Sequence, residues 1–110
     1  MIDWERVGEL YEQVGKEALP EVLSLFEQEV AEGLERLKAA RAPNVIAAEF
    51  HFLKGAALNL GMNDMARCYG EGETRALRGE DVTGERDRAL DEFPRVCAVL
   101  MAEWRTRLGA

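Results

Sequence analysis

The spacing of apolar residues constrains the fold of this chain more than any other feature of its sequence. Ile46, Phe50, Leu53, Ala57 and Leu60 follow one another at intervals of four, three, four and three residues, which places them on one face of a helix. Stripes of the same kind occur in other segments, and no strand pattern, internal repeat or low-complexity tract interrupts them. The sequence therefore predicts helices that pack their apolar faces together.

Glycine, proline and capping residues divide the stripes into one short helix and four longer ones. The short helix follows Asp3 and ends before Gly15. The longer helices are expected from Pro20 to about Arg41, from a cap at Asn44 to Gly61, from a cap at Asn63 or Asp64 to Gly79, and from Thr83 or Gly84 onward. Pro94 falls inside the last helix, and an interior proline removes a backbone hydrogen bond, so a kink or break is expected near residues 90–94.

The length of the chain fits one small domain. A chain of 110 residues buries a single core, and short loops favour antiparallel neighbours. We therefore expect residues 1–110 to form one all-α domain, an antiparallel four-helix bundle with an additional short N-terminal helix. Cys68 and Cys97 lack metal-ligand spacing, so each is expected to be a small core residue.

Charge and hydropathy exclude several classes of partner. The net charge of −7 argues against nucleic acid, which is bound mainly through clustered Lys and Arg. The apolar stretches are short and broken by charges, so neither a membrane span nor a secretory signal is expected, and the cytoplasm is favoured.

His51 is the only histidine, and the helical wheel turns it away from the apolar stripe. Lys54 lies one turn along the same face. A nitrogen nucleophile beside a cation and small neighbours is suited to accept an anionic group. The neighbours on this face are Ala47, Ala48, Gly55 and Leu58.

The segment from His51 to Gly61 resembles the phosphoacceptor motif of histidine-containing phosphotransfer (HPt) domains. That motif reads His-x-x-Lys-Gly with a second glycine six residues after the first, and His51, Lys54, Gly55 and Gly61 match it. The likeness extends to Ile2-Asp3-Trp4, Leu19-Pro20-Glu21, Phe26 and Glu73. The resemblance implies a phosphorelay in which His51 accepts a phosphoryl group from a receiver-domain aspartate and passes it to another receiver aspartate.

The resemblance also implies roles for single residues. Lys54 would offset the charge of the phosphoryl oxygens, and Gly55 would leave room for the aspartyl phosphate. Glu73 either accepts the Nδ1 proton of His51, which leaves Nε2 as the nucleophile, or is a surface charge paired near Arg75 or Arg78. The expected docking residues are Ala47, Ala48, Phe52, Gly55, Leu58 and Gly61.

Partners and cofactors follow from the same resemblance. The expected partners are the receiver domains of a hybrid histidine kinase and of a response regulator, and the chain itself is expected to be a monomer. No cofactor or metal is expected on this chain, and Mg²⁺ would belong to the receiver. The ten glycines are scattered without a nucleotide-binding loop, so no kinase activity is expected.

Some residues depart from the family pattern. Phe50 and Phe52 flank the histidine, which predicts a more aromatic site and an altered choice of partner. Glu49 lies near the apolar stripe and needs an arginine or a bundle end. Gly72 stands where a large apolar residue is expected, which predicts local space or extra mobility.

Two other functions remain open from the sequence. The same face could hold a receiver or a histidine kinase without any transfer, as a non-catalytic adaptor does. The chain could also be a structural bundle in which His51 is incidental. An independent hydrolase is not favoured, because no Ser or Cys lies in a recognisable triad arrangement and there is no second histidine.

Overall fold

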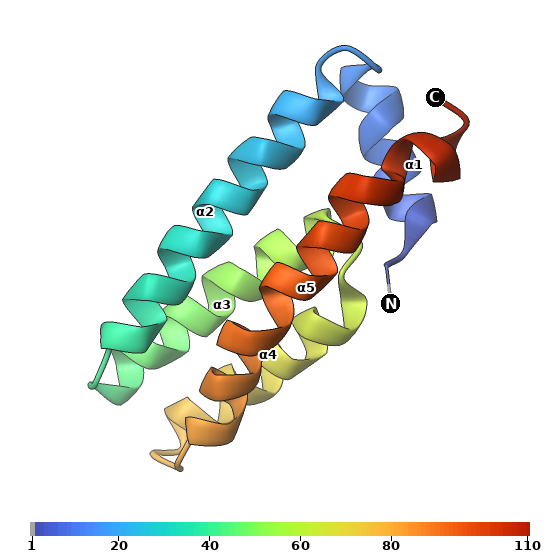
Figure 1. Ribbon diagram of the computed structural model, residues 1–110. Coiled ribbons are helices and arrows are strands. Elements are labelled where there is room, and N and C mark those ends of the chain that lie inside the picture. The colour runs from blue at the N-terminus through green and yellow to red at the C-terminus, as the bar shows by residue number, and fades with distance from the viewer. Residues whose placement is uncertain (1) are drawn as a thin grey trace.

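The computed structural model describes residues 2–110, and over that range the chain is helical without strands (Figure 1). This confirms the predicted all-α class. None of the helices within the described range combines the length and apolar character that crossing a membrane requires. The five helices are α1 (Trp4–Val14), α2 (Leu19–Ala39), α3 (Pro43–Asn59), α4 (Asn63–Leu77) and α5 (Thr83–Leu108).

The four long helices lie side by side in an elongated body of 45 × 21 × 20 Å (Figure 1). Helix α3 packs against α2 on one side and against α4 on the other, and α5 packs against both α4 and α2. Helix α1 lies across one end, where it contacts α5, α2 and α3. The helix that carries His51 is therefore held from both sides.

The predicted apolar stripe of α3 forms the centre of the core. Each of its five residues is buried, and Phe50 and Leu53 are fully enclosed. Both cysteines are buried and free of disulfides, in line with their expected role as small core residues.

The predicted caps of two helices are wrong. Helix α3 begins at Pro43 with Ala42 as its N-cap, so Asn44 lies inside the first turn. Proline suits that first position because its fixed φ fits the helix and its missing N–H is not needed there. Helix α4 takes Met62 as its N-cap, and the side chain of Asn63 instead donates to Asp3 Oδ2 at 3.3 Å.

Of the kink or break predicted near residues 90–94, the break does not occur, and the kink stays a prediction. Helix α5 runs without interruption from Thr83 to Leu108, with Pro94 inside it. Pro94 is exposed, which keeps its ring out of the buried core.

The structure accounts for Glu49 and Gly72. Arg36 Nε donates to Glu49 Oε2 at 2.7 Å, which supplies the arginine that Glu49 was expected to need. The space predicted beside Gly72 is filled by the ring of Phe50. Because Phe50 is fully buried, the prediction that it makes the histidine site more aromatic is wrong.

Candidate functional site

The imidazole of His51 projects from α3 into solvent. Its side chain is 69% exposed, and its Nδ1 lies 3.0 Å from Glu73 Oε2. The ring has no other hydrogen bond or ion pair among residues 2–110. Nε2 is thus the open nitrogen.

Glu73 reaches His51 from α4, because α3 and α4 are consecutive helices packed closely along their length. Its second carboxylate oxygen, Oε1, accepts a hydrogen bond from Lys54 Nζ at 3.2 Å. Arg75 instead pairs with Glu80 and Glu85. Of the two arrangements left open by the sequence, the structure therefore contains the one in which Glu73 faces the ring.

This contact selects a tautomer of the neutral imidazole. An ionised carboxylate can only accept hydrogen bonds, so Nδ1 must carry the proton that it donates to Glu73. The lone pair then lies on Nε2 and points to solvent. The contact with Glu73 therefore leaves Nε2 as the unprotonated nitrogen of the neutral ring.

Lys54 is held beside the ring by two neighbours. Its ammonium pairs with Glu73, and its aliphatic stem lies against Gly70, where an added Cβ would be 3.4 Å from Lys54 Cδ. The ammonium keeps hydrogen-bonding capacity, since it has three donors and one carboxylate partner here. Lys54 and His51 therefore bind the two oxygens of the same carboxylate.

Gly55 leaves the surface beside His51 open. It is exposed, and a Cβ built on it would meet no atom within 4 Å. Packing inside the protein therefore does not explain a glycine in the middle of α3, where it costs up to about 1 kcal/mol relative to Ala. The glycine instead leaves the surface next to His51 without a side chain.

The predicted docking residues divide into two groups. Ala48, Phe52 and Leu58 lie on the outer surface of α3, and the last two are 38% and 48% exposed. Ala47 is 4% exposed, so its prediction as a docking residue is wrong. It is buried because α3 packs against both α2 and α4, which widens the core-facing side of the helix.

Gly61 was also predicted to be a docking residue, and that prediction is wrong. Gly61 is buried in the turn between α3 and α4, and its carbonyl accepts a hydrogen bond from Asp3 N at 2.7 Å. The residue therefore anchors the N-terminal segment.

Two residues of α2 that the sequence did not single out, Arg36 and Gly33, lie against Phe52. The guanidinium carbon of Arg36 lies 5.2 Å from the centroid of the Phe52 ring. A Cβ on Gly33 would lie 3.0 Å from the same ring. Phe52 therefore packs against α2, and the only sequence signal for this was a glycine in the middle of that helix.

The described part of the chain contains no group of three His, Cys, Asp or Glu residues that could hold a metal ion. The site consists of one imidazole, one ammonium and one carboxylate at the surface.

The family model of the Hpt domain matches residues 21–108, a range that contains His51, Lys54 and Glu73. No curated protein and no solved structure matches the chain.

Proposed function

The chain belongs to the Hpt domain family, and from this premise we propose that it is a cytoplasmic phosphorelay intermediate that carries a phosphoryl group on His51. The observation that carries the proposal is the hydrogen bond between His51 Nδ1 and Glu73, which leaves Nε2 open to solvent. The antiparallel bundle of α2 to α5 would serve as a rigid support for this one ring.

The proposed reaction consists of two transfers. The Nε2 lone pair attacks the phosphorus of an aspartyl phosphate, the N–P bond forms, and the bond from phosphorus to the aspartate oxygen breaks. The aspartate leaves as a carboxylate, while the Nδ1 proton stays in its hydrogen bond to Glu73. The second transfer reverses these steps with a different receiver aspartate.

The residues around Nε2 support the approach of a receiver. Lys54 would stabilise the phosphoryl oxygens electrostatically, and Gly55 leaves the approach open. Ala48, Phe52 and Leu58 would form the apolar contact with the receiver. The receiver would supply Mg²⁺, and the partners would be receivers of a hybrid histidine kinase and a response regulator acting on a monomer of this chain.

Incubation with a receiver domain that carries radiolabelled aspartyl phosphate tests the proposal. We expect acid-labile phosphate on His51 of the wild-type chain and none in His51→Gln. A matched variant is Gly55→Arg, whose side chain starts in open space and should leave the helical content unchanged while blocking transfer.

Two outcomes would contradict the proposal. Label that appears on His51→Gln would place the phosphoryl group elsewhere. Receiver binding that survives His51→Gln, together with no transfer to the wild type from any receiver, would support the non-catalytic adaptor instead.

A further inference from the structure

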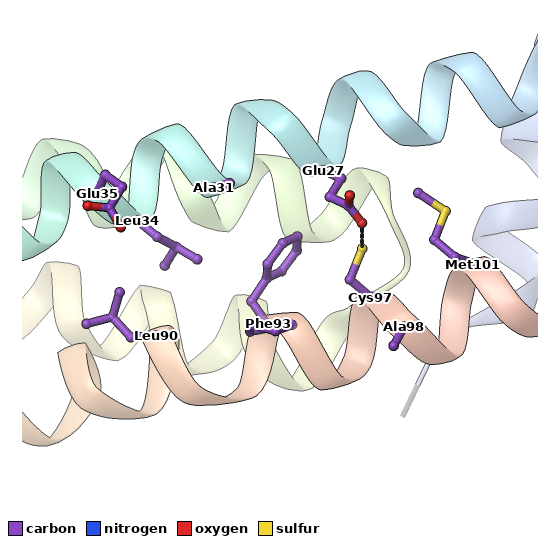
Figure 2. A pocket seen from close by; sticks show the side chains of 10 residues that line it. Glu27, Ala31, Leu34, Glu35, Leu90, Phe93, Cys97, Ala98 and Met101 are labelled. Carbon is purple, nitrogen blue, oxygen red and sulfur yellow. Dashed lines mark hydrogen bonds between the residues drawn. The ribbon is translucent and has the colours of Figure 1, made fainter.

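A groove of about 560 Å³ lies between α2 and α5 (Figure 2). The proposed phosphotransfer site lies on α3 and α4, and α3 and α5 are not adjacent helices in the bundle. The groove and His51 therefore belong to different faces of the bundle. A molecule bound in the groove would leave Nε2 of His51 accessible.

The floor of the groove is apolar, and two small side chains are among the residues at its exposed edges. Leu34 and Phe93 are buried side chains that point into the space between the two helices (Figure 2). Ala31 of α2 and Ala98 of α5 line the groove and are exposed. Because both alanines are small, neither covers the apolar floor with a long side chain.

Two carboxylates mark the α2 side of the groove. Glu27 and Glu35 are eight residues apart on one helix, which corresponds to about 12 Å along its axis. Glu27 accepts a hydrogen bond from the Cys97 thiol, and Glu35 has no partner within residues 2–110. No Lys or Arg from the described residues lines the groove. An occupant must therefore combine an apolar surface with positive charge.

We propose that this groove binds a cationic amphipathic helix of a partner protein. The apolar face of that helix would lie on Leu34 and Phe93, and two basic residues about two turns apart would meet Glu27 and Glu35. A helix matches the spacing because residues seven or eight positions apart share one face. A second copy of this chain is a poor occupant, since it carries a net charge of −7 and the groove is itself acidic.

The test uses a fluorescein-labelled helical peptide of about 16 residues with a Leu and Ala face and two arginines two turns apart. A second peptide has glutamine in place of both arginines. Fluorescence anisotropy with the full chain measures the affinity of each. We expect binding of the arginine peptide and at least about fivefold weaker binding of the glutamine peptide, the size that one or two exposed ion pairs provide.

Two variants locate the binding site. Glu35→Lys should weaken binding of the arginine peptide at least about fivefold, because it reverses one of the two groove charges. Glu29→Lys makes the same charge change on an exposed position of α2 that does not line the groove, and should change the affinity less than about twofold. Ala98→Trp fills the groove by bulk alone and should abolish binding.

The outcomes separate this proposal from the phosphorelay. All three variants should accept phosphate on His51 as the wild type does, since none of the three residues belongs to that site. Equal weakening of peptide binding by Glu29→Lys and Glu35→Lys, or peptide binding that survives Ala98→Trp, would show nonspecific attraction to an acidic chain. Either result would overturn the proposal that the groove is the binding site. The absence of any peptide binding would overturn it as well.

Discussion

The ring of Phe50 in α3 occupies the place where a side chain at position 72 of α4 would begin. A Cβ on Gly72 would lie 2.6 Å from the nearest ring atom, and Phe50 is fully buried. Phe50 directly precedes His51, and Gly72 directly precedes Glu73. The packing of this aromatic ring on a glycine therefore helps to set the separation of α3 and α4 at the level where His51 meets Glu73.

Gly72→Ala should destabilise the protein. The new methyl group must displace a buried ring, which costs about 1–3 kcal/mol and outweighs the helix propensity gained. Gly55→Ala is the matched control, because its methyl group would meet no atom. Urea denaturation should give a lower free energy of unfolding for Gly72→Ala and one raised by up to about 1 kcal/mol for Gly55→Ala. Equal shifts in both variants would show that the ring gives way freely.

Glu73→Leu should slow transfer from a phosphorylated receiver to His51. Without the hydrogen bond to Nδ1, neither the orientation of the His51 ring nor its tautomer is fixed. One such bond contributes about 1 kcal/mol, which corresponds to roughly a fivefold change in the transfer rate. Glu73→Gln keeps an acceptor oxygen and should lose less. Rapid-quench measurement of the transfer rate checks this, with Glu71→Leu, an exposed position two residues away, as the control. A similar rate in Glu71→Leu and Glu73→Leu would assign the effect to surface charge.

The burial of the α3 stripe could be predicted because it depends only on spacings of three and four within one helix. The partner of Glu73 could not be decided in the same way. Its carboxylate meets His51 and Lys54 across an interhelical gap, and the width of that gap depends on Phe50 and Gly72. Helical periodicity contains no information about the distance between two helices.

Two predictions made from short segments of the sequence, the helix cap at Asn44 and the exposure of Ala47, are wrong. Asn44 is a good capping residue, but Pro43 before it fits the first helical position, so the helix starts two residues earlier than a cap at Asn44 predicts. Ala47 shares a helix face with His51 in sequence, yet contact of α3 with two neighbouring helices buries it. The first error comes from an adjacent residue of the same segment, and the second comes from packing against other helices.

Cys97 should resist alkylation in the folded protein. Burial, followed by the hydrogen bond to Glu27 and the charge of that carboxylate, raises the pKa of the Cys97 thiol from 9.0 to about 12. The reactive thiolate is therefore scarce at pH 8. Iodoacetamide labelling followed by mass spectrometry should show slow modification at pH 8 that quickens as the pH approaches 12, and fast modification in urea at pH 8.

The raised pKa of Cys97 also gives the sign of a stability effect. The folded state favours the protonated thiol, so this contribution to stability is complete below pH 9 and declines between pH 9 and about 12. Cys97→Ala should lose that part of the alkaline decline in the free energy of unfolding. Rapid labelling of folded wild-type protein at pH 8 would contradict the raised pKa.

Gly61→Ala should be more destabilising than Gly79→Ala, although the two glycines have almost the same left-handed backbone, with φ of +72° and +73°. Alanine in that conformation costs about 1–2 kcal/mol at either position. At Gly79 the new Cβ meets nothing, whereas at Gly61 it would lie 2.5 Å from the carbonyl oxygen of Asp3. The Asp3 backbone must then move and strain its hydrogen bond to Gly61, so we expect a further loss of about 1 kcal/mol. Urea denaturation measures the difference in the free energy of unfolding between the two variants. Faster amide exchange in α1 of Gly61→Ala, but not of Gly79→Ala, would assign that difference to the docking of the N-terminal segment. Equal losses of stability in the two variants would mean that Asp3 contributes nothing to the turn.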